Sequence, residues 1–375
     1  MSSDLRICCL AERQVGIGSA AAAIEPHFRA NPSVTWVDVT YVKSGGWIER
    51  LPLPGRSGGV LRGLQQATSA LLRAKFDALF FLTHNPAVFQ QWALSRTPTL
   101  LWTDVTPALL DAQAEAYEHP VDSSRALQRL KHRLVRRTFE RASWCAAWSE
   151  WARRSFACDY AIEPSRTKVV APGIDLTKFK LERAPREGLP RLLFVGGNFA
   201  RKGGDLLLDV FRKHLRGRCE LDIVTRDEVA AEPGVRVHRG LRAGTPELLE
   251  LYDRASVFVL PTRGDCYSIA SLEAMAKGLP VVVSAVGGIS DIVEHGESGY
   301  LLDAVRGDLL LQSLEALLAD SKRAADMGRR GRRIAEERFD ARETASRLLA
   351  MLTELAAAKR RHLRKRDVRY REVDA

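Results

Sequence analysis

One segment combines glycines, cations and a helix start in a pattern that suits a phosphate group. In FVGGNFARKGGDLLLDVF, an apolar run leads into Gly196 and Gly197, and Arg201 and Lys202 precede a helical pattern from about Gly203. Glycine lets a ligand approach the backbone closely, while cations and the first amides of a helix attract anions. These residues predict a diphosphate site at a strand-to-helix turn. The alternative is a loop in which the glycines only turn the chain and both cations are solvated.

A second turn of the same kind carries two acids that stand eight positions apart. In SVFVLPTRGDCYSIASLEAMAKGLPVVVS, an apolar strand pattern ends at Pro261, Asp265 follows in a loop, and Glu273 lies inside a helix that runs from Ser268 to Lys277. Serine is a common helix cap. Ligands in open parallel sheets bind beyond the carboxyl ends of the strands, so we expect both acids near a ligand.

The stretch from Asp265 to Pro280 is similar to the donor-binding signature of family 4 retaining glycosyltransferases of the GT-B fold. That signature is an acid, seven other residues, and a glutamate followed by Ala-Met-Ala and Gly-x-Pro. Three more segments resemble the family in the expected order: APGIDLTKF its crossover, FVGGNFARKGGD its phosphate-binding turn, and VGGISDIVEHGESGYLL the stretch after the next strand. The resemblance implies transfer of a sugar from a nucleotide-diphosphate donor with retention of anomeric configuration.

The resemblance also implies a role for each residue of the signature. Glu273 accepts hydrogen bonds from the donor ribose, and Asp265 contacts hydroxyls of the sugar. Charge-assisted hydrogen bonds of this type contribute about 1.5–3 kcal/mol each. The distal phosphate meets backbone amides near the start of the helix, those of Tyr267, Ser268 and Ile269.

Breaking a glycosyl-phosphate bond leaves negative charge on the diphosphate, so catalysis depends on stabilising the leaving group. We expect Arg201 and Lys202 to supply this stabilisation. The sequence contains no Asp-x-Asp motif of the kind that holds Mg²⁺ or Mn²⁺ in other transferases. We therefore expect no metal and no other cofactor. In this family the leaving phosphate oxygen takes the acceptor proton on the same face, so a dedicated enzymic base is not required.

The sequence departs from the family pattern at several positions. The first acid is usually Glu, but here it is Asp265, and the usual Gly-Phe-Gly after it is Cys-Tyr-Ser. Sugar choice is expected to differ accordingly. The arginine that commonly follows the first glycine of the phosphate turn is replaced by Gly197, and we expect Arg201 beside Lys202 to supply that charge.

The acceptor is expected to bind the first half of the chain, across a cleft from the donor. Many relatives place a histidine at the end of a first-domain strand, where LLWTDVTP has Asp104; His84 is a nearby alternative. Asp104 contacts the donor sugar or the acceptor, or it only caps a helix or turn. Gly16 and Gly18, in the loop after the first strand, are expected to line the acceptor site. The acceptor is a glycan, a lipid-linked molecule or a small molecule.

Short apolar runs alternate with helical patterns in both halves of the chain, which predicts parallel sheets of the α/β class. We expect two Rossmann-like, doubly wound domains that face each other across a cleft, as in the GT-B fold. The acceptor-binding domain spans residues 1–180, and the nucleotide-sugar-binding domain spans residues 181–340. Residues 341–375 are expected to form a helix that crosses back to the first domain and ends in a basic tail.

A chain of 375 residues with 46% hydrophobic and 27% charged residues fits two globular domains. Neither a signal peptide nor a run of about 18 apolar residues is evident, so a cytoplasmic protein is the simplest interpretation. The six cysteines are scattered, without the spacing of a zinc site, and are expected to be reduced thiols.

The net charge of +11 indicates phosphate-rich partners. Basic residues are concentrated in Arg125–Arg141, an amphipathic helix with an apolar stripe of Leu127, Leu130 and Leu134, and in a tail at 359–372. Both clusters are either solvated or dock on the anionic inner face of a membrane. Nucleotide substrates and lipid surfaces explain the charge with fewer assumptions than nucleic acid, which is not expected as a partner.

Two rival functions share this architecture. A sugar-nucleotide epimerase would convert the donor without an acceptor. An interaction or scaffold subunit would retain the fold without turnover, an alternative motivated by the departures at Asp265 and Gly197.

Overall fold

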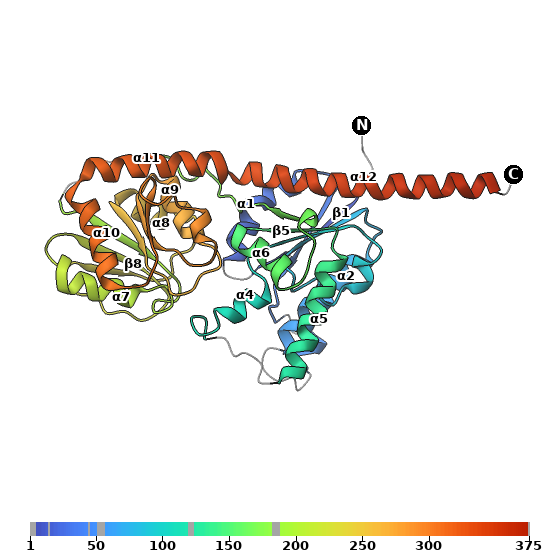
Figure 1. The fold of residues 1–375 in the computed structure, drawn as a ribbon, viewed down its shortest axis with the longest axis horizontal. Helices are drawn as coiled ribbons and strands as arrows, with labels where there is room; N and C mark the ends of the chain where they lie inside the picture. Colours follow the sequence, from blue (N-terminus) through green and yellow to red (C-terminus); the bar gives the residue numbers. More distant parts are fainter. Residues whose placement is uncertain are drawn as a thin grey trace.

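Two α/β domains make up the protein, each built on a six-stranded parallel sheet (Figure 1). The computed structural model describes residues 5–13, 16–43, 46–50, 57–118, 124–181 and 188–373. The strand orders are β2-β1-β3-β4-β5-β6 in the first domain and β12-β11-β10-β7-β8-β9 in the second. The predicted fold class, two Rossmann-like domains of the GT-B type, is confirmed.

The elements of the first domain alternate along the chain. Its strands are β1 (Ile7–Glu12), β2 (Val34–Val39), β3 (Ala78–Leu82), β4 (Thr99–Thr103), β5 (Trp144–Ala147) and β6 (Thr167–Val169). Its helices are α1 (Ile17–Arg29), α2 (Ser57–Leu72), α3 (Gln91–Leu94), α4 (Pro107–Ala112), α5 (Arg125–Arg141) and α6 (Glu150–Cys158), with short 3-10 turns η1 (Trp47–Arg50) and η2 (Pro164–Arg166). The short strand β6 was not expected from the sequence.

The second domain repeats this alternation. Its strands are β7 (Arg191–Val195), β8 (Glu220–Val224), β9 (Val235–His238), β10 (Val257–Leu260), β11 (Val281–Ser284) and β12 (Gly299–Leu302). Its helices are α7 (Gly204–Val210), which continues as a π turn η3 (Phe211–Leu215), α8 (Pro246–Arg254), α9 (Ile269–Ala276), the 3-10 turn η4 (Gly287–Asp291), α10 (Gly307–Ala319) and α11 (Ser321–Arg338).

Burial on both faces explains why the central strands are continuous apolar runs. Every residue of β3 (ALFFL) and of β10 (VFVL) is buried. Helices cover both faces of a parallel sheet, so alternation of polar and apolar residues is not needed. Polar residues such as Glu12 and Thr103 stand at the ends of β1 and β4.

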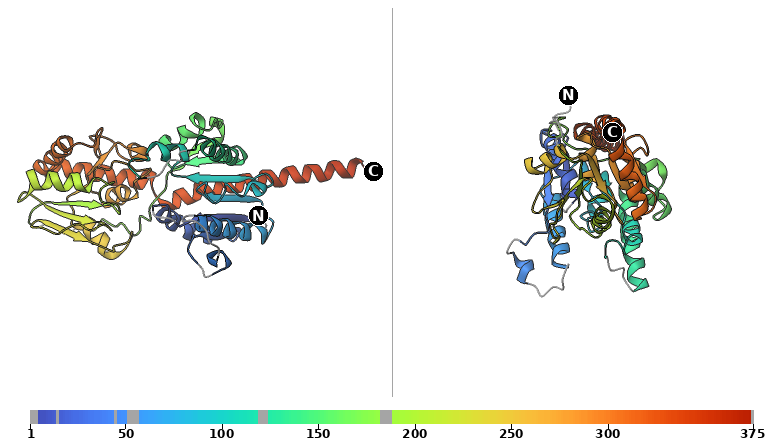
Figure 2. Two further views of the ribbon diagram at one scale, coloured as in Figure 1. Left: turned by 90° about the horizontal axis from the view of Figure 1, so that it is seen from below. Right: turned by 90° about the vertical axis from the view of Figure 1, so that its left-hand side faces the viewer.

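The last helix, α12 (Ala341–Val373), ties the second domain to the first. It packs against α1, β3 and β4, and buries Leu348 and Leu352. Figure 2 shows α12 running along the first domain, with its last turns projecting beyond it. The chain passes between the two domains twice, and the two connecting segments are in close contact. A methyl group on Gly173, in the first segment, would lie 2.4 Å from the backbone nitrogen of Ala341, in the second.

The first basic cluster forms the helix predicted for it, α5, with the same bounds, Arg125–Arg141. Leu127 and Leu130 are 40% and 54% exposed, while Val135, Thr138 and Phe139 are buried. Only the second half of α5 reaches the core, so most of the leucine stripe stays at the surface.

The segment from residue 359 was expected to be a basic tail that is solvated or docks on an anionic membrane, and the helix α12 continues through it. Lys359 Nζ donates a 3.0 Å hydrogen bond to the carbonyl of Phe76, and Arg360 pairs with Asp77 at 2.7 Å. These contacts bind the first cations of the segment to the first domain.

Candidate active site

A cleft of about 1650 Å³ lies between the domains and is lined by the carboxyl ends of strands from both. It is lined by all but one of the residues singled out from the sequence: Gly16, Asp104, Gly196, Gly197, Arg201, Lys202, Asp265, Tyr267, Ser268, Ile269 and Glu273. The exception is Gly18, which lies in the first turn of α1, where an added methyl group would lie 3.8 Å from the backbone carbonyl carbon of Arg13. Its neighbours Ile17 and Ser19 line the cleft, and the role predicted for Gly18 itself stays a prediction.

The phosphate-type turn after β7 is compact and depends on its glycines. A methyl group on Gly196 would lie 2.8 Å from Cβ of Lys202. Gly203 has φ +76°, and a methyl group there would lie 1.9 Å from the carbonyl oxygen of Pro261. The side chain of Asn198 accepts a 2.8 Å hydrogen bond from the amide of Arg201. The turn is therefore held rigidly against the loop that follows β10.

The two predicted cations of this turn both have protein partners. Lys202 Nζ forms an ion pair with Oδ2 of Asp265, and both side chains are largely buried. Arg201 donates a 2.7 Å hydrogen bond to the carbonyl of Gly264, and its guanidinium lies 4.3 Å from the ring centroid of Tyr117. Arg201 thus links the two domains at one end of the cleft.

The second turn brings Glu273 into the cleft from inside α9. Ser268 caps this helix, as expected, by accepting a 3.2 Å hydrogen bond from the amide of Ser271. Burial raises the pKa of Glu273 to about 7, although a hydrogen bond from Tyr252 opposes the shift. An acid with this pKa is partly ionised near neutral pH, and its charged form is stabilised by hydroxyl donors.

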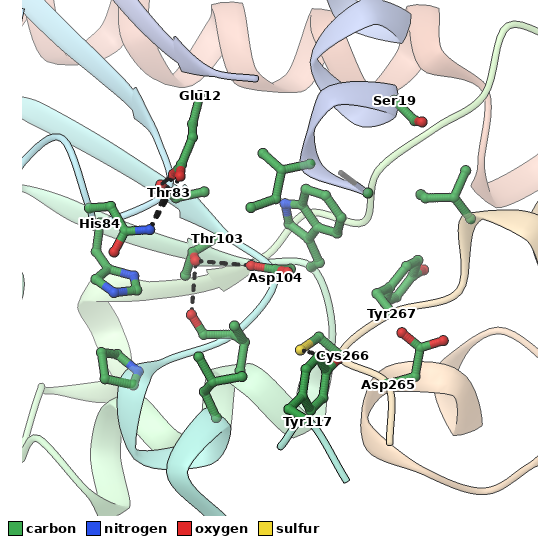
Figure 3. Close-up of a pocket in the computed structure, with 18 of the residues that line it drawn as sticks. Glu12, Ser19, Thr83, His84, Thr103, Asp104, Tyr117, Asp265, Cys266 and Tyr267 are labelled. Atoms are coloured by element: carbon green, nitrogen blue, oxygen red, sulfur yellow. Dashed lines mark hydrogen bonds between the residues drawn. The ribbon is translucent and has the colours of Figure 1, made fainter. Parts of the chain in front are cut away.

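The first domain contributes a pair of acids to the opposite wall of the cleft. Figure 3 shows Asp104 between Glu12 and the side that carries Asp265 and Tyr267, with the Glu12 carboxylate pointing toward Thr83. Burial raises the pKa of Asp104 to about 7, and the nearby charge of Glu12 acts in the same direction. Burial also raises the pKa of Glu12, which accepts hydrogen bonds from Thr83 Oγ1 and Asn85 Nδ2.

Sequence reasoning missed Glu12, although the signal was present. Glu12 is the last residue of β1, and an acid that ends a buried strand of a parallel sheet lies at the edge where ligands bind. His84 was considered as an alternative to Asp104, and it also lines the cleft. Burial lowers the pKa of His84 to about 4, so its ring is neutral at pH 7. Its Nδ1 atom has no hydrogen-bond partner among the described residues (Figure 3).

A segment of the first domain, residues 113–117, contacts the donor-side loop directly. Gln113 Nε2 donates a 3.4 Å hydrogen bond to the carbonyl of Asp265, and the Tyr117 hydroxyl lies 3.3 Å from Sγ of Cys266. A methyl group on Gly264 would lie 2.6 Å from Cβ of Ala116. These contacts close one side of the cleft.

The described residues include neither a candidate metal-binding group nor a helix able to span a membrane. The described part of the chain contains no group of three or more His, Cys, Asp or Glu side chains that could hold a metal ion. None of its helices combines the length and the apolar character needed to span a bilayer.

Comparison with known proteins finds glycosyltransferases. Residues 189–320 match the family model described as glycosyl transferases group 1. The chain is 33% identical over 223 residues to a D-inositol 3-phosphate glycosyltransferase from Thermobispora bispora, covering 52% of each chain. It is 30% identical over 207 residues to an MMP alpha-(1->4)-mannosyltransferase from Mycolicibacterium hassiacum, covering 52% of this chain and 49% of the relative. The chain therefore spans about half the length of the curated relatives it matches.

Solved structures resemble the whole fold at low identity. The sucrose-phosphate synthase of Thermosynechococcus elongatus aligns with a TM-score of 0.73 at 16% identity, covering 95% of this chain and 100% of that one. The Anabaena protein HepE, solved in complex with UDP-glucose, aligns with a TM-score of 0.70 at 17% identity, covering 94% and 100%. The resemblance predicted from the sequence is confirmed: residues 189–320 match the glycosyl transferases group 1 model, and the chain as a whole has the GT-B fold of these solved structures.

Proposed function

We propose that this protein is a retaining glycosyltransferase that uses a nucleotide-diphosphate sugar as donor. The observation that carries the proposal is the position of Glu273, Asp265 and Lys202 on one wall of a single interdomain cleft. The names of the relatives, all transferases of glycosyl groups, favour transfer over epimerisation.

The donor is anchored by the second domain. Glu273 accepts hydrogen bonds from the ribose, and Asp265 contacts hydroxyls of the sugar. Lys202 and Arg201 stabilise the diphosphate. Tyr267, Ser268 and Ile269, at the start of α9, line the same cleft. Their backbone amides bind the distal phosphate, because the first amides of a helix have no partner within the helix.

The acceptor hydroxyl approaches from the first domain, where Glu12 and Asp104 line the cleft. A bond forms between the acceptor oxygen and the anomeric carbon, while the bond from that carbon to the phosphate oxygen breaks. The acceptor proton passes to the departing phosphate oxygen on the same face of the sugar. Nucleoside diphosphate leaves, and neither an enzymic base nor a metal ion takes part. The acceptor is a hydroxyl-bearing glycan, lipid-linked molecule or small molecule.

A donor screen tests the proposal. Thermal shift with UDP-, GDP- and ADP-sugars in EDTA should identify one donor class that raises Tm, and transfer or donor hydrolysis should persist in EDTA. Glu273→Ala should abolish both signals. Glu228→Ala, which changes a carboxylate that is 92% exposed, is the matched control and should resemble the wild type.

Three results would argue against the proposal. If no nucleotide sugar raised Tm, the cleft would not be a donor site. Conversion of the donor to an isomer in the absence of acceptor would favour the epimerase. Activity that survives Glu273→Ala would show that a different site acts.

A further inference from the structure

The space beside Gly197 is filled by an arginine from the neighbouring strand. A methyl group on Gly197 would lie 2.6 Å from Nη2 and 2.9 Å from Nε of Arg226. Arg226 follows the end of β8, and β8 pairs with β7 so that Val224 lies opposite Val195. The guanidinium therefore reaches across from the end of one strand and covers the glycine turn at the end of the next.

Arg226 differs from Lys202 and Arg201, the cations of the glycine turn, in its contacts with the described residues. Lys202 pairs with Asp265, and the guanidinium of Arg201 is engaged by Gly264 and Tyr117. Within the described ranges, Arg226 forms neither an ion pair nor a side-chain hydrogen bond, yet its side chain lines the cleft.

The acids that follow Arg226 in the chain are already engaged. Asp227 accepts a 2.6 Å hydrogen bond from the amide of Phe199, and Glu228 pairs with Arg239 at 3.3 Å. The charge of Arg226 is therefore left for a ligand. A planar guanidinium offers paired donors that match the oxygens of a phosphate group.

We propose that Arg226 binds the diphosphate of the donor, with its guanidinium in the space that a side chain on residue 197 would occupy. The inference rests on the proposed function and adds a residue to its donor site. Lys202 lies against Gly196 and Arg226 lies against Gly197, so the two cations flank the same turn. A diphosphate seated on this turn meets Lys202 on one side and Arg226 on the other.

Binding measurements on two kinds of ligand test this assignment. The wild-type protein is titrated calorimetrically with UDP, GDP and ADP, and the strongest binder is then compared with its own nucleoside. Arg226→Gln should weaken the diphosphate about tenfold or more, the loss of one charge-assisted hydrogen bond, and should leave the nucleoside unchanged. Arg226→Lys should retain part of the affinity. Arg236→Gln, which changes a paired arginine of β9 outside the cleft, is the control.

A second variant tests the contact between the two residues. Gly197→Ala places a methyl group where the guanidinium lies, so it should also weaken the diphosphate. Its φ is not in the left-handed region, and alanine is therefore tolerated by the backbone. In the double variant with Arg226→Gln, the alanine should add little further loss, because the group it displaces is already gone.

The outcomes separate this inference from the function on which it rests. Unchanged diphosphate affinity in Arg226→Gln would overturn the inference, as would equal weakening of diphosphate and nucleoside. Additive losses in the double variant would also overturn it, since Gly197 would then act independently of Arg226. A wild-type protein that binds none of the three diphosphates and transfers no sugar would instead overturn the proposed function.

Discussion

The hydroxyl of Tyr252 donates a 2.9 Å hydrogen bond to Oε2 of Glu273, and both residues are buried. The bond aims the carboxylate and lowers its pKa, which burial has raised to about 7. Tyr252 is not among the residues that line the cleft. Tyr252 is thus a positioning residue for the proposed ribose contact.

Tyr252→Phe should therefore raise the KM for the donor by about 3- to 10-fold with little change in kcat, the effect of one hydrogen bond. The pKa of Glu273 should also rise. As the pH is lowered, the carboxylate should therefore be protonated earlier, and the donor affinity should begin to fall at a higher pH than in the wild type. Steady-state kinetics between pH 6 and pH 9 would measure both effects. Tyr300→Phe, outside the cleft, is the control. An equal fall in kcat without a shift in the pH profile would contradict this role.

Removing both members of the ion pair of Lys202 and Asp265 should affect stability and activity differently. Lys202→Gln leaves a buried carboxylate without its partner, and Asp265→Asn leaves a buried ammonium group, so each should destabilise by up to about 3–5 kcal/mol. The double variant should recover much of that stability but no transfer activity. Denaturant unfolding and a transfer assay would show this. Full activity in the double variant would exclude both side chains from the reaction.

Asp104 predicts a pH-dependent gain of stability on substitution. Its pKa is raised from 3.8 to about 7, so the neutral acid favours folding fully below pH 4, and this contribution is lost as the pH rises through 7. Asp104→Asn should therefore raise Tm at pH 9 by at least about 2 °C, the shift expected for 1 kcal/mol, and should change it little at pH 4.

The control for this prediction is Asp308→Asn. A hydrogen bond from Arg306 lowers the pKa of Asp308, so its loss should leave Tm at pH 9 unchanged or lower. Thermal melts across this pH range test both variants. A gain at pH 4 as large as that at pH 9 would count against a buried charge at Asp104.

Gly203 and Gly217 form a matched pair for testing the phosphate turn. Both have positive φ, at +76° and +77°, but a methyl group on Gly217 meets nothing within 4 Å. Gly217→Ala should cost only backbone strain, about 1–2 kcal/mol. Gly203→Ala adds the clash with Pro261 and should cost about 1–3 kcal/mol more. Chemical denaturation would compare the free energies of unfolding of the two variants. Equal decreases would mean that the turn accommodates the methyl group on Gly203 without a clash.

Short-range patterns predicted a large part of the fold and of the second-domain side of the cleft. Apolar runs identified the central strands, and the spacing from Asp265 to Glu273 placed one acid before α9 and the other inside it. Ser268 was correctly assigned as the cap of that helix. These predictions succeeded because the residues involved belong to one strand, one loop and one helix, whose geometry depends on neighbours in the chain.

Contacts between residues of separate strands were not predicted from the sequence. Asp104, which follows β4, was predicted as a site residue, but Glu12, which ends β1, was missed, and strand order puts both on one wall of the cleft. The contact of Arg226 with Gly197 likewise depends on the pairing of β8 with β7. In α5, the sequence predicted the helix and its leucine stripe, but only the structure shows that the core reaches the second half of the helix alone.

The sequence by itself therefore determined the class of each domain, the phosphate turn and the acidic signature, since these depend on spacing within single elements. Only the tertiary structure decided which acids of the first domain line the cleft opposite Asp265, which cation covers Gly197, and where the cations at the start of the expected tail bind. Those contacts join elements distant in the chain, and their positions follow from sheet order and helix packing, which local spacing does not encode.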